Sequence, residues 1–325
     1  MRRIKGYTLI ELLIATGLGI FLLSGVVQIF NSNSQSIRLV NASARVQEGG
    51  RIAMEMLTRD IRMADYWGCA PDPSTITNHL KTDGSDTDYD PDIHNPQTGS
   101  GLGGLNDVGV LTIGDAITGT ERTVLPGTDV IILKGSRRWN GVSVIPPYMP
   151  MPAGALQLNN GNDIPQGTIL LVSNCSGGDF FSNTATQTLT NGTVTHNTGV
   201  DTGTMVQNDT KNFSQTYEGD AVISSPYTKT YFLGVNGSGG TSLYRYGNEN
   251  DQMLELVPNI TDLQFVYGED TSNDLAANVF RDAATVADMD DVMAIQVTIN
   301  VESPNGSNTL AREYKSTATI RNRLL

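Results

Sequence analysis

The chain has 325 residues, a formal net charge of −13 and a sequence pI of about 4.6. This acidic balance argues against nucleic acid as the main partner. The sequence contains no P-loop, no dinucleotide-binding glycine pattern after a strand and no G-x-S-x-G motif, so it predicts neither an enzyme nor a cofactor.

The first element in chain order is an apolar segment, residues 7–30, which follows a short basic leader, residues 1–6. At about 1.5 Å per residue, a helix of this length can cross a hydrocarbon layer of about 30 Å. Positive charges before a membrane segment hold that end in the cytoplasm. The leader supplies them as Arg2, Arg3 and Lys5.

Glu11 is isolated near the start of the apolar segment, because no charged residue occurs from Leu12 to Ile37. A charged group in the hydrocarbon costs about 2.5–3.5 kcal/mol on insertion scales, so such a carboxylate needs a partner. Cleavage after Gly6 would create an α-amino group at Tyr7, one helical turn from Glu11. That cation could come from this chain or from a neighbouring copy.

These residues resemble the class III signal of type IV pilins and type II secretion pseudopilins. The resemblance rests on Lys5-Gly6 followed by Tyr7-Thr8-Leu9-Ile10-Glu11-Leu12-Leu13-Ile14-Ala15. It implies that a prepilin peptidase cuts after Gly6 and methylates the Tyr7 amine, and that Glu11 is the assembly carboxylate. Tyr7 departs from the usual phenylalanine but is still aromatic. An ordinary secretory signal or a plain anchor is the alternative, but the run is long and ends without a small-x-small site.

Residues 31–66 continue the helix as an amphipathic stretch. Apolar residues recur in it at three- to four-residue spacing, which predicts one apolar stripe that packs on a soluble domain. The stripe consists of Leu39, Ala42, Val46, Ala53, Leu57, Ile61 and Ala64. Gly49 and Gly50 are expected to weaken or bend the helix by about 1 kcal/mol each relative to alanine. Pro71 is expected to end the helical region.

Cys69 and Cys175 are the only cysteines of the chain. In an oxidising compartment beyond the membrane, an isolated pair is most simply a disulfide. A zinc site lacks a C-x-x-C motif or a nearby histidine that would complete the ligands. The sequence therefore predicts a Cys69–Cys175 disulfide.

Residues 67–325 are expected to form an extracytoplasmic domain rich in β-strands, with long irregular loops at 70–107 and 180–220. Alternating apolar and polar residues predict antiparallel strands. The expected strands are Val108–Ile113, Thr123–Lys134, Thr168–Asn174, Thr228–Val235, Ser242–Tyr246, Asp262–Tyr267, Val292–Val301 and Arg312–Ile320. Hairpins are expected at Asn191-Gly192 and at Gly237–Gly240. The predicted fold class is α+β, a long N-terminal helix packed on a large antiparallel sheet, in one domain or two small lobes.

Few residues suggest chemistry. The three histidines, His79, His94 and His196, are expected to face solvent in polar loops. Asp86, Asp88 and Asp90, with Asp83 and Asp92, form a weak calcium candidate, but Pro91 stands where an EF-hand loop needs glycine, and a solvated acidic loop is the preferred interpretation. A second such candidate contains Asp270, Asn273 and Asp274. The aromatic residues around the 231–246 hairpin are interpreted as sheet and core packing.

The rest of the chain resembles the PilW type of minor pilin. The resemblance rests on Gly50–Met54, Leu57–Arg62, Gly68-Cys69, Ser242–Arg245, Leu263–Asp270 and Thr319–Arg323. It implies a non-enzymatic subunit of a pilus priming or tip complex. The implied partners are other minor pilins, the major pilin, prepilin peptidase and the inner-membrane assembly platform. It also implies a single span of the bacterial inner membrane, with the N-terminus cytoplasmic and the domain periplasmic, before the protein reaches the pilus at the cell surface.

Two other functions remain open. A J-type pseudopilin of type II secretion shares the stem and the sheet, although it is usually smaller. A tip adhesin would use the loops at 70–107 and 180–220 to contact surfaces or other cells.

Overall fold

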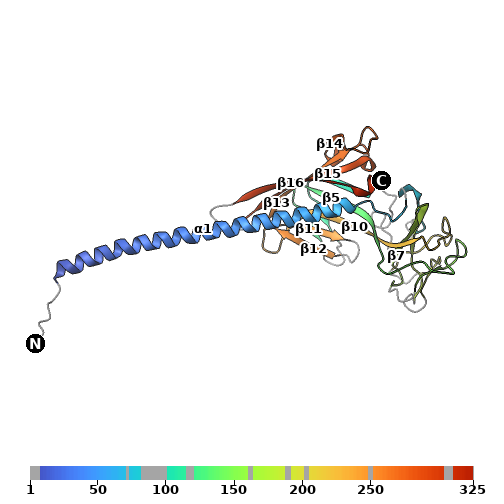
Figure 1. Ribbon diagram of the computed structural model, residues 1–325, viewed down its shortest axis with the longest axis horizontal. Coiled ribbons are helices and arrows are strands. Elements are labelled where there is room, and N and C mark those ends of the chain that lie inside the picture. Colours follow the sequence, from blue (N-terminus) through green and yellow to red (C-terminus); the bar gives the residue numbers. More distant parts are fainter. Residues whose placement is uncertain are drawn as a thin grey trace, which may run out of the picture.

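A single long helix, α1 (Leu9–Met63), projects from a globular part made of strands (Figure 1). The computed structural model describes residues 8–70, 73–81, 101–114, 121–159, 164–186, 192–200, 205–247, 252–303 and 310–324. The helix has no proline anywhere along its length and runs without a break through Gly49 and Gly50. The bend expected at these glycines therefore does not interrupt the helix. At 1.5 Å per residue, α1 is about 80 Å long.

The larger sheet is eight-stranded, with the order β1-β8-β7-β10-β11-β12 and with β5 paired to β10 and β2 paired to β5. Its strands are β1 (Ile76–Asn78), β2 (Leu102–Val108), β5 (Thr128–Arg138), β7 (Ile169–Asn174), β8 (Gly177–Ser182), β10 (Val222–Val235), β11 (Thr241–Gly247) and β12 (Gln252–Pro258). Its pairs are antiparallel except β1–β8, which is parallel.

The second sheet is four-stranded and antiparallel, with the order β14-β13-β15-β16. Its strands are β13 (Ile260–Glu269), β14 (Val279–Arg281), β15 (Val292–Glu302) and β16 (Ala311–Thr319). Two short ladders join β3 (Thr112–Ile113) to β4 (Arg122–Thr123) and β6 (Leu156–Gln157) to β9 (Thr193–Val194). The 3-10 helices are η1 (Pro73–Thr75), η2 (Ala283–Thr285), η3 (Met289–Asp291) and η4 (Arg321–Arg323).

The second half of α1 packs on the inner faces of both sheets. Helical spacing places its apolar residues on one side, and five members of the expected stripe are fully buried there: Val46, Ala53, Leu57, Ile61 and Ala64. Each large side chain buried in this way contributes about 1.5–3 kcal/mol. Leu39 stays 40% exposed, so the packed part of the stem begins at about Val46 rather than at Leu39. We call this packed unit, with residues 101–138 and 222–324, the base domain.

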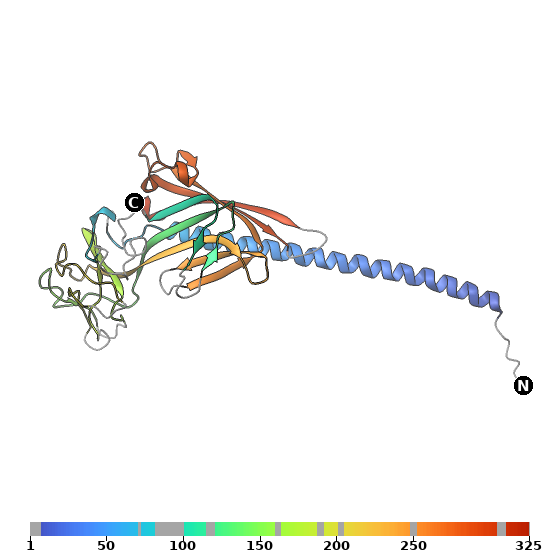
Figure 2. The same ribbon diagram turned by 180° about the vertical axis from the view of Figure 1, so that it is seen from behind.

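A second lobe is inserted between β5 and β10. These neighbouring strands pair from Ile131↔Tyr231 to Arg138↔Ser224, and the described residues between them, within 139–221, form a separate hydrophobic core. Residues 67–81 cross from the end of α1 to this lobe, where β1 pairs with β8. We call residues 67–81 and 139–221 the distal lobe. Its described part lies at the opposite end of the molecule from the start of α1 (Figures 1 and 2).

The α+β prediction is confirmed, and so is the hairpin at Gly237–Gly240, which joins β10 to β11. One expected strand differs from the structure. Apart from Val108, only the end of the range Val108–Ile113 is a strand, as the two-residue β3, and the longer strand β2 lies earlier, at Leu102–Val108, inside a range expected to be irregular. The hairpin expected at Asn191-Gly192 is not tested, because residues 187–191 lie outside the described residues; Thr193–Val194 beyond it pairs with β6.

The aromatic residues near the β10–β11 hairpin contribute to packing, as expected. Tyr227, Tyr231, Phe232 and Tyr244 are buried, with exposed fractions of 0–7%. The rings of Phe232 and Tyr244 stack with their centroids 5.8 Å apart.

Candidate functional site

The first half of α1 is uncovered apolar surface. Its large side chains from Leu9 to Phe30 are each 55–77% exposed, although a soluble protein would bury them. Figure 2 shows this half of the helix standing clear of every strand. Its length and composition allow it to cross a membrane. We call this exposed half of the helix, from Leu9 to Phe30, the rod, and it is the candidate functional surface. The packed half of α1 holds the rod at a fixed orientation to the base domain.

A capping box closes the N-terminal end of the rod. The Thr8 hydroxyl accepts a hydrogen bond from the Glu11 amide at 3.4 Å, and Glu11 Oε2 accepts from both the amide and the hydroxyl of Thr8 at 3.0 Å. These bonds satisfy orphan donors of the first turn. Among the described residues, the bonds to the Glu11 carboxylate go to Oε2, and the other oxygen, Oε1, accepts none. Gly6 and Tyr7 lie outside the described residues.

Asp60 anchors the packed half of α1 to β10. Its Oδ2 accepts from Tyr231 Oη at 2.6 Å and from Lys229 Nζ at 2.9 Å, and its side chain is 7% exposed. Burial raises the pKa of Asp60, but the bond from Tyr231 and the charge of Lys229 outweigh it and hold the pKa below its ordinary value. Asp60 was not singled out from the sequence, although it falls three residues after Leu57, on the buried side of the helix.

The C-terminal end of α1 is clasped by the last residues of the chain. Arg323 Nε donates to Asp65 Oδ2 at 2.6 Å, and its Nη1 donates to the carbonyls of Met289 and Val292. Asn322 Nδ2 donates to the carbonyl of Ala64, the C-cap residue, at 2.8 Å. The C-terminal segment Arg321–Arg323, which carried part of the resemblance, therefore fixes the end of the stem.

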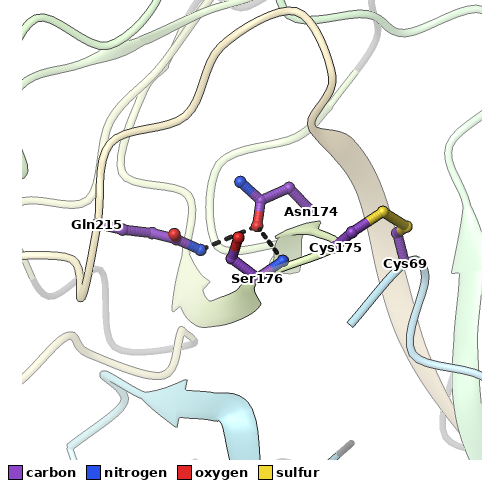
Figure 3. Close-up of a disulfide and its surroundings, with 5 residues drawn as sticks. All are labelled: Cys69, Asn174, Cys175, Ser176 and Gln215. Carbon is purple, nitrogen blue, oxygen red and sulfur yellow. Dashed lines mark hydrogen bonds between the residues drawn. A yellow bond between two sulfur atoms is a disulfide. The ribbon is translucent and has the colours of Figure 1, made fainter. Parts of the chain in front are cut away.

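The predicted disulfide between Cys69 and Cys175 is confirmed, with a Cα–Cα distance of 4.7 Å. It ties the segment after α1 to the turn between β7 and β8, where Asn174 Oδ1 accepts from the Ser176 amide and from Gln215 Nε2 (Figure 3). Gly68 has φ +80, and a Cβ there would come within 2.2 Å of Ser173 Oγ. Glycine is therefore required beside the cysteine.

The expectation that the histidines face solvent is wrong for His79 and His196, each 3% exposed. His79 Nε2 bonds Asp179 Oδ1 at 2.5 Å, and Asp179, fully buried, also accepts from Tyr217 Oη and from the Ser214 amide and hydroxyl. A buried carboxylate needs such donors. The sequence could not show this network, because its members come from three segments that are far apart in the chain, at His79, at Asp179 and at Ser214 and Tyr217.

His196 lies in the same core. Its ring stacks on Phe213 with the centroids 3.8 Å apart, and its Nε2 bonds the carbonyl of Gly154 at 2.9 Å. Burial lowers the pKa of His196. Since Ser214 and His79 both bond to Asp179, rather than to each other, the cluster has the arrangement of a structural network and not of a hydrolytic triad. His94 lies outside the described residues.

The acidic calcium candidates fare differently. Asp83, Asp86, Asp88, Asp90 and Asp92 all lie outside the described residues. In the second candidate, the Asp270 carboxylate is surrounded by amide donors from Ser272, Asp274 and Leu275, which a cation would have to displace. Across the part of the chain that the structure describes, no group of three or more His, Cys, Asp or Glu side chains could hold a metal.

Comparison with known proteins gives one family. Residues 230–322 match the family model described as Type IV Pilus-assembly protein W. The matched stretch runs from β10 through β16 to the Asn322 clasp, and so contains the half of the base domain that follows the distal lobe. It supports a protein related to type IV pilus assembly, which is a structural role. No curated protein and no solved structure matches the chain.

Proposed function

We propose that this protein is a minor pilin, an assembly subunit of the priming or tip complex of a type IV pilus. The observation that supports this most is the construction of α1: one unbroken helix whose first half is uncovered and apolar and whose second half is docked on the base domain. Such a helix can be inserted in a membrane and later in a bundle of similar stems, while it carries a folded domain.

The mechanism is assembly through the stem. After cleavage between Gly6 and Tyr7 and methylation of the Tyr7 amine, Glu11 of one subunit faces the amine of a neighbour as the stems slide together. In a low dielectric an unpaired carboxylate is penalised and a paired one is tolerated, so the pair sets axial register more than it adds stability. The free Oε1 of Glu11 supports this role, because the amine can be added without breaking the capping box.

The proposed location follows from the same features. The protein is held in the bacterial inner membrane with its N-terminus in the cytoplasm, because the leader is basic. The domain is periplasmic, where an exposed disulfide persists. From there the subunit enters the pilus, in contact with other minor pilins, the major pilin and the assembly platform, after processing by prepilin peptidase.

The distal lobe is a candidate for contacts at the tip. Residues 139–221 are an insertion between two paired strands, and they lie outside the stretch that matches the family model. An insertion of this kind can vary without disturbing the stem and the base domain, which supports the adhesin alternative as an added role of the same subunit.

Two variants test the proposal in the native host. Glu11→Ala is expected to be processed normally but to be absent from sheared pili, whereas Glu48→Ala, an exposed glutamate on the packed half of the same helix, is expected to enter them. Gly6→Ala is expected to remain as the longer precursor. Mass spectrometry is expected to find a mature N-terminus at Tyr7 with one added methyl group.

Three results would contradict the proposal. Normal incorporation of the Glu11→Ala variant would remove the assembly role of that residue. An intact leader in the wild-type protein would remove the cleavage site. Loss of type II secretion with unchanged piliation, on deletion of the gene, would favour the J-type pseudopilin.

A further inference from the structure

The loop of residues 270–278 projects from the outer edge of the four-stranded sheet. It joins β13 to the edge strand β14, at the top of the view in Figure 1. Asn273 and Leu275 in this loop have left-handed backbones, with φ of 56° and 62°. This conformation is uncommon for residues with a Cβ, and it persists where the surroundings determine it.

Two side chains hold the loop in this shape. The Asp270 carboxylate accepts from the amides of Ser272 at 3.0 Å and Leu275 at 2.7 Å. Asn278 Oδ1 accepts from the Thr271 amide at 3.1 Å and from the Ser272 hydroxyl at 3.0 Å. The loop is therefore ordered by its own hydrogen bonds before any partner arrives, so a partner would not have to order it.

This ordered loop presents apolar side chains to solvent. Leu275 is 53% exposed and Phe280, on β14, is 45% exposed. The Phe280 ring lies over the backbone of β13, since a Cβ added at Gly268 would come within 2.9 Å of it and within 2.8 Å of Ala277 Cβ. Exposed apolar side chains on a support that is already ordered can bind a partner without the cost of ordering the loop.

The surroundings of these apolar side chains are acidic. Residues 270–291 carry six aspartates and one arginine, a net charge of −5. The exposed aspartates among them are Asp274, Asp282, Asp288, Asp290 and Asp291. An acidic rim repels anionic lipid headgroups and nucleic acid, and it favours a partner with basic side chains around an apolar depression.

We propose that residues 270–282 form a docking knob for a neighbouring pilin-type subunit whose contacting surface is basic. The inference rests on the proposed function, because parallel stems in one bundle bring the base domains side by side, and β14 is an outermost strand.

Photo-crosslinking of the full-length protein in its native host tests the knob. Three strains each carry one photoreactive residue. In the first it replaces Leu275. In the second it replaces Val110, which is 93% exposed in the β2–β3 loop, and in the third it replaces Leu18 in the uncovered half of α1. From position 275 we expect a crosslinked peptide of a protein that carries the same class III signal, from a segment with exposed Lys or Arg. From position 110 we expect at least tenfold less of that product.

Substitutions then test the chemistry. Leu275→Asp or Phe280→Asp is expected to lower recovery of the same partner with the protein at least tenfold, while Val110→Asp leaves it unchanged. Asp270→Ala keeps Leu275 but removes the support of the loop, and is expected to weaken the crosslink. Leu275 is 53% exposed, so Leu275→Asp should keep the wild-type melting temperature and carries the test. Phe280→Asp also removes the packing of its ring on β13, so recovery of the partner with this variant is compared at a temperature well below its own melting temperature.

The outcomes separate the knob from the proposed function. The knob would be overturned, and the stem mechanism left intact, if position 18 crosslinks to pilin-type proteins but position 275 gives no product. The same conclusion would follow if the product at position 275 comes from an acidic surface or from another class of protein. A pilin-type product from position 275 with none from position 18 would overturn the stem mechanism and leave the knob, and no pilin-type product from either position would overturn both.

Discussion

Gly49 and Gly50 are adjacent on α1 but meet different surroundings, so alanine at each position gives a matched test of how the stem is docked. A Cβ at Gly50 would come within 2.2 Å of Tyr314 Cε2 and 2.4 Å of its Cζ. A Cβ at Gly49 would meet Val257 at 3.4 Å and Val301 at 3.7 Å, which are ordinary contacts. Both glycines are otherwise helical, so both gain the same helix propensity.

The magnitudes follow from two opposing effects. Alanine is favoured over glycine inside a helix by about 0.5–1 kcal/mol, and Gly49→Ala should stabilise the protein by that amount. At Gly50, overpacking costs about 1–3 kcal/mol. Tyr314 cannot swing away without losing the bond from its hydroxyl to the Val46 carbonyl at 3.1 Å. We therefore expect Gly50→Ala to be less stable than Gly49→Ala by about 1–3 kcal/mol.

Urea unfolding of the full-length protein in mild detergent measures this difference, with the fluorescence of Trp67 and Trp139 as the signal. A double variant provides the control: in a Tyr314→Ala background the ring is gone, and Gly50→Ala should become stabilising. If Gly50→Ala stabilises as much as Gly49→Ala in the wild-type background, the close contact between the stem and β16 is refuted.

Two further predictions concern the distal lobe. Cys69→Ser should lower the free energy of unfolding by about 4–5 kcal/mol in the chain-entropy account, because the disulfide closes a loop of 106 residues. In urea unfolding, the Cys69→Ser variant and the reduced wild-type protein should have the same midpoint, below that of the oxidised wild-type protein. A variant with the midpoint of the oxidised wild-type protein would contradict this. Lowering the pH from 7.5 to 5.5 should reduce the free energy of unfolding, because burial depresses the pKa of His196 below its ordinary value of 6.5. The neutral, buried imidazole contributes its full stability to the folded state above pH 6.5, and this contribution is lost as the pH falls towards the folded-state pKa. His196→Gln should flatten that part of the profile, and an equally steep profile in the variant would assign the effect to other groups.

The stem could be predicted from the sequence more accurately than the sheets. The spacing of Val46, Ala53, Leu57 and Ile61 identified the buried side of α1, because helical periodicity is a local property that needs no partner to be recognised. The same spacing failed at Leu39, since nothing in the sequence tells how far along a helix the sheet extends. The sequence also could not show why a glycine stands at position 50, because the space beside it is filled by the Tyr314 ring, from a residue far away in the chain.

Networks that join distant segments escaped sequence analysis for the same reason. His79 and His196 occur among polar residues, which is typical of exposed loops, yet Asp179 and Phe213 draw them into a core. The Cys69–Cys175 pair could be predicted only because two cysteines allow a single pairing. At the candidate site, Glu11 was evident from its isolation in an apolar run, whereas Asp60 needed Lys229 and Tyr231 to explain its burial.

The buried charges at the end of α1 solve a problem that the apolar stripe creates. A stripe that repeats every turn can pack on a sheet in more than one register, and a slip of one turn, about 5.4 Å, would still bury apolar side chains. Such a slip would separate Asp60 from Lys229 and Tyr231, and Asp65 from Arg323. Breaking a buried ion pair costs about 3–5 kcal/mol. The ion pairs of the two aspartates therefore disfavour the shifted register, which the apolar stripe alone would allow. In the assembly mechanism that we propose, a force along the axis of the stem would therefore move the base domain with it, at a fixed distance from Glu11.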